Sequence, residues 1–391
     1  LTPTRFLEAD WTAGGGLALI AGSVSSHVAI LARARGVPMV VGLGDMDLNG
    51  HRQAVVDGDQ GRLVLSPDSE VEAYCRRAAA DTAQRHARES RFLHQPARSQ
   101  DGEAVQVQLN IMDPAELDPL QPQTCDGIGL MRSEFLFRDG ATVPDEETQF
   151  RAYRRLLDWA GDKPVTVRTL DVGGDKPIAG LTPEGEANSF LGLRGVRLSL
   201  ARPDVFRIQL RALARAATTG NLKVMLPMVT VPDELAQVRD MFESVCAELE
   251  GEGMDFALPP LGIMVEVPAV AAAPDLFAEA AFFSIGSNDL TQYITASARD
   301  NPAVGALCDS AHPAVLRLMQ GVIDFGRHSG LEVSLCGDMA AEPRFVPLLL
   351  GMGLRRFSVA STALARVKAT IAATTVRDCN PADAQARKRH A

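Results

Sequence analysis

Several features that identify large classes of proteins are missing from this sequence of 391 residues. No uninterrupted apolar run approaches the roughly 20 residues that a helix needs to cross a bilayer. The six cysteines are scattered without a C-x-x-C pair, which argues against a disulfide framework or a zinc site and favours a reducing cytoplasm. The spacing G-x-x-x-x-G-K-S/T of a P-loop is also absent. We therefore expect a cytoplasmic protein that is not inserted in a membrane.

An excess of positive charge is missing as well. The formal net charge is −10, from 39 Lys and Arg against 49 Asp and Glu. This balance argues against non-specific binding to nucleic acid and favours solubility. The remaining composition, 46% hydrophobic and 23% charged, is ordinary for a globular protein with a large core, and the length predicts one to three domains.

The N-terminal part of the chain is rich in Gly, Val and Ala. Short strand-like runs, "GLALIAG", "MVVGLG" and "GRLVLSP", surround one helix pattern at residues 28–35, which predicts a small α/β domain over residues 1–68. Residues 69–103 have helical periodicity and many charges, so we expect a linker helix followed by a polar turn. The sequence starts at Leu1 without an initiator methionine or a signal-peptide pattern, and we expect a fragment whose upstream part is missing.

From about residue 104 onward, short apolar runs alternate with helix-length segments. The runs indicate parallel strands that are buried on both faces; they are "VQVQLNIMD", "GIGLMRSEF", "PVTVRTLD", "LKVMLPMV", "LGIMVEVP", "FFSIGSND", "EVSLCGDM" and "RRFSVAS". Eight strands with intervening helices predict an α/β fold, a TIM-like (β/α)8 barrel over residues 104–391. A doubly wound open sheet is the alternative that the pattern leaves open.

Polar side chains cluster at the C-terminal ends of these runs, where the active site of a barrel lies. They are Arg132, Glu134, Arg168, Asp171, Glu266, Asn288, Asp289, Cys336 and Asp338. Glu266 and Asp289 end consecutive strands, so their carboxylates can converge on one cation. Hard oxygen ligands without His or Cys nearby suit Mg2+. A salt bridge to an arginine of the barrel is the alternative for each carboxylate.

Three arginines and one cysteine could act at the same ends of the strands. Arg132, Arg168 and, on a weaker pattern, Arg299 could clamp a phosphate or a carboxylate through bidentate hydrogen bonds. Mg2+ together with several arginines is the usual equipment for stabilising a phosphoryl group during transfer. For Cys336 the residues leave two interpretations open, a buried small hydrophobic side chain or a proton donor or nucleophile.

His27 stands at the predicted start of a short helix in the stretch "GSVSSHVAILARARGVP". Ser25 or Ser26 can cap the helix, and Gly36 with Pro38 can end it. The positive end of the helix dipole favours the neutral imidazole, and the free backbone N–H groups of the first turn could bind a phosphate. A histidine that serves only in capping or packing remains the equal alternative on these grounds.

Ten stretches of the sequence resemble Enzyme I of the bacterial phosphoenolpyruvate-dependent sugar phosphotransferase system. They run through most of the chain and are "SSHVAILARARGVPMVVG", "GIGLMRSEFLF", "RTLDVGGDKP", "NSFLGLRGVR", "LPMV", "GIMVEVPA", "FFSIGSNDLTQY", "HPAVLRL", "CGDMA" and "LLLGMGLRRFSV". The resemblance implies part of a swivelling β/β/α phosphohistidine domain, a linker helix and a phosphoenolpyruvate-binding barrel.

The resemblance also implies a role for individual residues. The phosphorylated histidine of the family matches His27, which would accept the phosphoryl group on Nε2. The acid that protonates the enolate matches Cys336, and the Mg2+ ligands match Glu266 and Asp289. The phosphoenolpyruvate-binding positions match Arg132, Arg168, Asn288, Asp289 and Arg299.

The implied function is phosphoenolpyruvate–protein phosphotransfer: His27 takes the phosphoryl group with release of pyruvate, and in the intact protein passes it to the carrier protein HPr. The family also implies a homodimer through the barrel. Three departures stand out: the upstream HPr-docking region is absent from this sequence, Ser23 and Ser25 replace residues of the family motif, and the C-terminal tail is short. The alternatives are a relative of phosphoenolpyruvate synthase or pyruvate phosphate dikinase, and a non-catalytic regulatory relay module.

Overall fold

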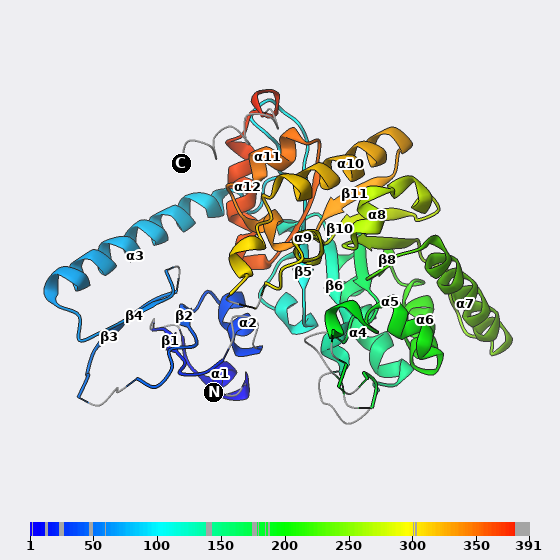
Figure 1. Cartoon of the computed structure of the whole chain (residues 1–391), viewed down its shortest axis with the longest axis horizontal. Coiled ribbons are helices and arrows are strands. Elements are labelled where there is room, and N and C mark those ends of the chain that lie inside the picture. Colours follow the sequence, from blue (N-terminus) through cyan, green and yellow to red (C-terminus); the bar gives the residue numbers. More distant parts are fainter. Residues whose placement is uncertain are drawn as a thin grey trace. The chain divides into compact units, whose positions relative to one another are not determined.

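A computed structural model of the chain consists of two compact units, Leu1–Arg91 and Phe92–Ala391 (Figure 1). It describes residues 1, 3–11, 15–22, 27–46, 50–58, 60–137, 143–173, 178, 180–183, 185–186, 188–299, 301 and 303–379. Within these residues, no helix combines the length and the apolar character that crossing a membrane requires.

The first unit is small and contains two short sheets. Strands β1 (Leu17–Ala18) and β2 (Met39–Val40) pair in parallel, and β3 (Ala54–Asp57) pairs with β4 (Arg62–Leu65) in an antiparallel hairpin. Helices α1 (Pro3–Glu8) and α2 (His27–Ala34) pack together through Phe6, Val28, Ala32 and Val37. The sequence predicted α2, β1, β2 and β4, but neither α1 nor β3. The capping role predicted for Ser25 or Ser26 lies outside the described residues.

A long helix, α3 (Ser69–Glu89), closes the first unit. Asp68 caps it, because its carboxylate accepts hydrogen bonds from the backbone N–H groups of Glu70 and Val71 at 3.0 and 2.8 Å. None of its residues is buried. A single turn, η1 (Ser90–Phe92), follows it.

The second unit contains a closed parallel barrel of eight strands, as the sequence predicted. Their order around the barrel is β10-β11-β12-β5-β6-β7-β8-β9. They are β5 (Gln106–Ile111), β6 (Ile128–Arg132), β7 (Val165–Arg168), β8 (Leu222–Leu226), β9 (Leu261–Val265), β10 (Phe282–Ile285), β11 (Glu332–Leu335) and β12 (Arg356–Val359). The pairing of β12 with β5, in register from Arg356 with Gln106 to Val359 with Leu109, closes the ring. The open sheet is therefore excluded.

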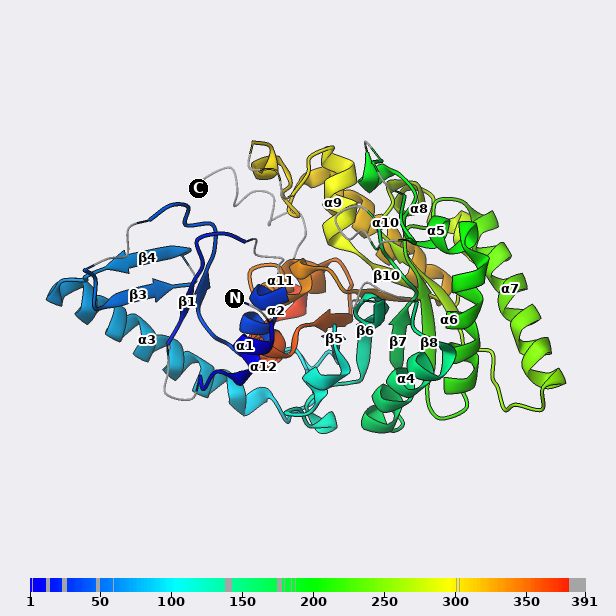
Figure 2. The same ribbon diagram turned by 90° about the horizontal axis from the view of Figure 1, so that it is seen from below.

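Helices surround the barrel. They are α4 (Glu146–Ala160), α5 (Val196–Ala201), α6 (Pro203–Ala216), α7 (Pro232–Gly251), α8 (Pro268–Ala272), α9 (Ser287–Thr295), α10 (Pro313–Ser329), α11 (Val346–Gly351) and α12 (Leu364–Ala372). Figure 2 shows α6 and α7 outside strands β7 and β8. In α4, Tyr153, Leu156, Leu157 and Ala160 are buried at the spacing of one helix face, while Asp145 caps the first turn through the N–H of Thr148.

Side chains along each strand of a barrel point alternately into the barrel and toward the surrounding helices. In β7, Val165 and Val167 belong to the large core between strands and helices, whereas Arg168 does not. A separate cluster fills the barrel itself; it consists of Leu130, Met225, Met264, Phe282 and Cys336. The polar side chains that the sequence analysis selected lie at the carboxyl ends of the same strands.

Candidate active site at the carboxyl ends of the barrel strands

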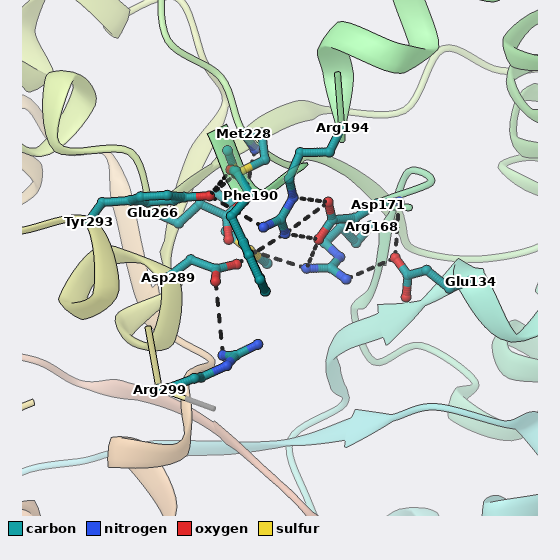
Figure 3. A network of polar contacts seen from close by, with 11 residues as sticks. Glu134, Arg168, Asp171, Phe190, Arg194, Met228, Glu266, Asp289, Tyr293 and Arg299 are labelled. Carbon is teal, nitrogen blue, oxygen red and sulfur yellow. Dashed lines mark hydrogen bonds and ion pairs between the residues drawn. The ribbon is translucent and has the colours of Figure 1, made fainter. Parts of the chain in front are cut away.

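The residues predicted from the sequence fall on neighbouring elements of the barrel. Arg132 ends β6, Arg168 ends β7, Glu266 follows β9, Asn288 and Asp289 lie in the first turn of α9 after β10, and Cys336 follows β11. Figure 3 shows Arg168, Glu266, Asp289 and Arg299 in one network of polar contacts. His27 belongs to the other unit, where it is the first residue of α2; its side chain lies outside the described part of the structure.

Arg168 is buried between two carboxylates. Its guanidinium lies 2.8 Å from Glu134 Oε1 and 3.1 Å from Asp171 Oδ2. Glu134 Oε1 also accepts the backbone N–H of Asp171 at 3.0 Å, which fixes the loop after β7. Burial lowers the pKa of Arg168, but the charges of Glu134 and Asp171 outweigh it, so the pKa is raised overall. Arg168 is therefore a permanent buried cation at the end of β7.

A second buried arginine, Arg194, shares Asp171 with Arg168 (Figure 3). It forms a fork on Asp171, with Nε 3.2 Å from Oδ1 and Nη2 3.0 Å from Oδ2, and Nη2 also reaches Asp289 Oδ2 at 3.2 Å. Its Nη1 donates to the Tyr293 hydroxyl at 3.3 Å. Sequence reasoning did not select Arg194. It stands in "NSFLGLRGVR", between η5 (Ser189–Leu191) and α5, after a short apolar stretch that belongs to no strand.

The backbone around Arg194 requires glycine. Gly195 has a φ of +58°, and a Cβ at that position would lie 2.7 Å from Cβ of Met228. Met228 itself is a non-glycine residue in the left-handed region, with a φ of +59°. This close approach places the N–H of Met228 2.8 Å from Glu266 Oε1. The same contact therefore positions both Arg194 and Glu266.

Glu266 and Asp289 form the acidic side of the site. Glu266 is 1% exposed, and burial, followed by the charges of Asp289 and Asp171, raises its pKa to about 8. Asp289 Oδ1 is buried without a hydrogen-bond partner among the described residues. Nη1 of Arg299 lies 3.9 Å from this oxygen, and Arg194 pairs with the other oxygen, Oδ2, at 3.2 Å. Two buried carboxylates, one with an unpartnered oxygen, are the donor set that a hard divalent cation takes. No group of three or more potential ligands occurs in the part of the chain that the structure describes.

Two further arginines leave positive charge unpaired or weakly paired beside this network. Arg132 is in register with Arg168 on the neighbouring strand, is half-buried, and has neither a hydrogen bond nor an ion pair with any residue of the described ranges. Arg299 follows α9, and its side chain remains 41% exposed. An unpaired, half-buried guanidinium is a site that favours an anionic ligand.

Cys336 lies within the barrel, 3% exposed. Its thiol donates to the carbonyl oxygen of Ile285 at 3.5 Å, and burial raises its pKa. A raised pKa keeps the thiol protonated, which suits a proton donor and disfavours a nucleophile. Of the interpretations that the sequence left open, the buried position is confirmed, and a role as proton donor stays a prediction.

Asn288 is oriented by Asp338, the first residue of η8 (Asp338–Ala341). Asn288 Nδ2 donates to Asp338 Oδ2 at 3.0 Å, and the backbone N–H of Asp338 donates to Asn288 Oδ1 at 3.0 Å. The two bonds join the start of α9 to the segment after β11. Asn288 therefore contacts η8, and within the described residues it has no hydrogen bond to the Arg168 network.

In comparisons with known proteins, two family models match separate parts of this chain. The family model described as "PEP-utilising enzyme, PEP-binding domain" matches residues 86–376, and that described as "PEP-utilising enzyme, mobile domain" matches residues 1–61. A phosphoenolpyruvate-protein phosphotransferase of Haloferax volcanii is 41% identical over 97% of this chain and 66% of its own length. One from Priestia megaterium is 37% identical over 97% of this chain and 67% of its own length. A multiphosphoryl transfer protein of Xanthomonas campestris is 39% identical over 95% of this chain. The chain spans 44% to 67% of the length of these three relatives.

Proposed function

The chain belongs to the PEP-utilising enzymes, and we propose that it is the phosphoenolpyruvate-binding part of a phosphoenolpyruvate–protein phosphotransferase. In this proposal phosphoenolpyruvate binds at the carboxyl ends of the barrel strands and transfers its phosphoryl group to His27. Pyruvate is the product. The proposal divides the chain into three parts: a phosphohistidine domain over residues 1–68, a linker helix over 69–103 and a phosphoenolpyruvate-binding barrel over 104–391.

The observation that carries the proposal is the position of Arg132. An unpaired guanidinium lies beside a buried arginine on the next strand, at the edge of a network that holds an unpartnered carboxylate oxygen. Such a surface presents one place for an anion and one for a cation, side by side. A substrate that carries both a phosphate and a carboxylate, bound together with a divalent metal, satisfies both.

Each arginine would have a different role. Arg132 and Arg299 would bind the phosphate and carboxylate of phosphoenolpyruvate, because they retain free donors. Arg168 is fixed by Glu134 and Asp171 and would stabilise the phosphoryl oxygens from a preorganised position. The structure adds Arg194, which the Asp171 fork and the contact with Asp289 hold in the same network. We propose that Asn288 binds the substrate through its amide, which Asp338 orients.

Glu266 and Asp289 would hold Mg2+. They fit this ion because both are carboxylates, both are buried, and one Asp289 oxygen has no hydrogen-bond partner. With two protein ligands, the remaining positions would be taken by substrate oxygens and water, as is usual for this ion. When bound, the metal supplies positive charge that stabilises the transferring phosphoryl group.

The chemistry requires one transfer and one protonation. The P–O bond of phosphoenolpyruvate breaks, and a P–N bond forms with Nε2 of His27. The enolate that remains takes a proton at carbon three, and Cys336 would donate it, because burial keeps its thiol protonated. The resulting thiolate regains its proton from water. In the intact protein, phosphorylated His27 would pass the group to the carrier protein HPr of a sugar phosphotransferase system, in the cytoplasm and as a homodimer.

Labelling tests this proposal directly. The full chain is incubated with phosphoenolpyruvate labelled with 32P in the phosphate and with Mg2+, and label and pyruvate are measured together. We expect acid-labile label on His27 and one pyruvate for each phosphoryl group. His27→Ala should abolish the label, while His51→Ala, which changes another histidine of the same unit, should leave it unchanged. Label on a different residue, or pyruvate release without Mg2+ at the full rate, would overturn the proposal.

A further inference from the structure

Asn110 lies at the carboxyl end of β5 and contacts Cys336 across the barrel. Its Nδ2 donates to the backbone carbonyl oxygen of Cys336 at 3.0 Å, over a separation of 226 residues along the chain. In the ring of strands β12 stands between β5 and β11. The Asn110 side chain therefore spans β12 inside the barrel and reaches the residue that follows β11.

The orientation of the Asn110 amide is determined by its partners. The carbonyl oxygen of Cys336 can only accept, so the NH2 group of Asn110 must face it. Oδ1 of Asn110 then accepts from the hydroxyl of Ser358, which lies 2.6 Å away. Ser358 is buried, and its other acceptor, the carbonyl oxygen of Leu109, is more distant at 3.2 Å. Ser358 thus holds Asn110 in the one amide orientation that serves Cys336.

The backbone of Cys336 is held on both sides. Its N–H donates to the carbonyl oxygen of Ile285 at 3.0 Å, and its carbonyl accepts from Asn110. The registered pairing of β11 with β12 is Leu335 with Phe357 and stops one residue before Cys336. Asn110 therefore supplies, toward β12, the hydrogen bond that the sheet does not. The next residue packs closely against the start of α9, because a Cβ on Gly337 would lie 2.0 Å from the Ser287 hydroxyl.

We propose that Asn110 is the positioning residue of Cys336: by fixing the peptide between residues 336 and 337, it aims the thiol at carbon three of the enolate. The inference rests on the proposed function. In the step concerned, the S–H bond of Cys336 breaks, a C–H bond forms at carbon three, and the thiolate regains its proton from water. Asn110 touches neither substrate nor the reacting atoms, and a thiol held in one direction protonates one face of the enolate.

Asn110→Asp is the decisive variant, because it keeps the size of the side chain and the contact with Ser358. It removes the NH2 donor and places an acceptor against the carbonyl of Cys336. A misplacement of about 1 Å at a reacting group costs roughly 100-fold. We therefore expect kcat for pyruvate formation to fall by roughly 10- to 100-fold, with KM for phosphoenolpyruvate changed by less than about threefold. The rate at which label reaches His27 should stay within about twofold, since Asn110 does not act on the transfer step.

Two further variants separate positioning from damage to the fold. Ser358→Ala keeps the donor on Asn110 and removes only its anchor, so its kcat should lie between those of the native chain and Asn110→Asp. Gln108→Met is the matched control: Gln108 is buried on the same strand and two residues before Asn110. Within the described residues Gln108 has no hydrogen bond to Cys336, whereas Asn110 has one, so Gln108→Met should retain the native kcat. A fall in kcat of Gln108→Met equal to that of Asn110→Asp would overturn the inference.

The configuration of the methyl group in pyruvate distinguishes a positioning role of Asn110 from a purely structural one. Phosphoenolpyruvate with tritium at one position of carbon three, turned over in deuterium oxide, yields a chiral methyl group in pyruvate. The native chain should give one configuration in excess, and Asn110→Asp should give nearly equal amounts of both. Retention of the native excess together with the native kcat in Asn110→Asp would show that Asn110 does not aim the thiol.

Thiol alkylation, followed peptide by peptide in the full chain, needs no phosphoenolpyruvate. In Asn110→Asp, Cys336 should react at least about fivefold faster than in the native chain or Gln108→Met, whereas the partly exposed Cys308 should react at an unchanged rate. A native chain that makes no pyruvate overturns the proposed function and, with it, the role in protonation. An unchanged alkylation rate of Cys336 in Asn110→Asp overturns the positioning by itself.

Discussion

Arg194 holds Asp171 through contacts of 3.2, 3.1 and 3.0 Å between its guanidinium and the carboxylate. Asp171 is 2% exposed and Arg194 5%, so neither charge has water to replace a lost partner. Removing one member of a buried ion pair costs about 3–5 kcal/mol. Without Arg194, Asp171 would keep only Arg168 as a partner, and Asp289 would lose its contact at 3.2 Å, so the buried network would carry excess negative charge. The pair therefore connects the stability of the barrel to the geometry of the site.

The first prediction concerns this pair. Arg194→Met should lower the free energy of unfolding by about 3–5 kcal/mol, measured by denaturation of the full chain in urea. Arg344→Met is the control: Arg344 pairs with Glu342 on the surface, with side chains 68% and 43% exposed, and its loss should cost at most about 1 kcal/mol. Equal effects of the two variants would contradict the burial argument.

The second prediction separates the two steps of the reaction. Cys336→Ala removes the proton donor but leaves the Arg168 network intact, so it should block net formation of pyruvate while phosphoryl exchange with His27 survives. Pyruvate release and exchange of label into phosphoenolpyruvate are measured in the same sample. Cys308→Ala changes a cysteine outside the barrel cluster and should leave both rates unchanged. Native pyruvate release by Cys336→Ala would remove the cysteine from the mechanism.

The third prediction follows from a buried hydroxyl without a partner. Ser284 is 1% exposed, and its Oγ has no hydrogen-bond partner in the part of the chain that the structure describes. Leaving such a group unsatisfied costs about 1–3 kcal/mol, so Ser284→Ala should leave stability unchanged or raise it by up to about 1 kcal/mol. Ser334→Ala, which removes a bond of 3.4 Å to the carbonyl of Phe283, should instead lower it by about 1 kcal/mol.

The same variant should also alter Cys336. Burial raises the pKa of the Cys336 thiol. Among the described residues, the Ser284 hydroxyl has no hydrogen-bond partner while the thiol is protonated and donates to Ile285, but it can donate to the thiolate and so partly opposes the effect of burial. Ser284→Ala should therefore raise the pKa further, which the pH dependence of Cys336 alkylation measures. An unchanged or lower pKa would show that Ser284 does not stabilise the thiolate.

The fourth prediction concerns the loop that holds the end of the described chain. Asp101 accepts from the Ser99 hydroxyl and from the backbone N–H groups of Val376 and Arg377. The hydroxyl of Ser99 first, and then the Val376 N–H, lower the pKa of Asp101 from 3.8 to about 2. Because the folded-state pKa is depressed, the stabilisation is complete above the unfolded value and is lost as pH falls toward 2.

Urea denaturation tests this window. Asp101→Asn should have a lower urea midpoint than the native chain at pH 6. The difference should shrink between pH 4 and pH 3, because there the Asp101 carboxyl of the unmutated protein becomes protonated in the unfolded state. Asp378→Asn, a change in the neighbouring turn η10 (Val376–Asp378), is the control and should show no such pH dependence. A difference that grew on acidification would have the wrong sign for this account.

The fifth prediction addresses the metal. Chelation of divalent cations should abolish pyruvate release, and added Mg2+ should restore it. Glu266→Gln keeps the oxygen that accepts from Met228 but loses the charge, so it should need at least about tenfold more Mg2+ for half-maximal activity. Glu279→Gln, on the surface beside Arg239, should need no more than the native chain. Full activity of Glu266→Gln at the native Mg2+ concentration would exclude Glu266 as a ligand.

The fold was predictable to a large degree, and particular residues show why. Parallel strands buried on both faces must be apolar on both, so runs such as "PVTVRTLD" stand out and end visibly at Arg168. In the first unit the strands have two to four residues, too few to establish a pattern, and β3 was missed. The predicted domain boundaries and the roles of the site residues stay predictions.

Site residues could be predicted only where they directly follow an apolar run that forms a strand. Arg132, Glu266 and Cys336 are the first polar or reactive residues after apolar runs. Arg194 follows the stretch "FLGL", which belongs to no strand, so strand ends do not mark it; the left-handed Gly195 and its contact with Met228 bring it to the network. Asn110 lies inside the run "VQVQLNIMD", where nothing distinguishes it from Gln106 or Gln108. Its partner stands 226 residues away, and no local spacing encodes a contact of that separation.

The pairing of β5 with β12 also constrains how the protein can be made. Gln106 and Arg356 meet over a separation of 250 residues, so the ring cannot close until nearly the whole barrel has been synthesised. A ribosome adds roughly 5–20 residues each second, and β5 therefore waits about 12–50 s for its partner. During that time the edges of the growing sheet are unpaired and open to other chains. A chain terminated before Arg356 would never leave this state, and we expect it to aggregate rather than accumulate as a folded seven-stranded barrel.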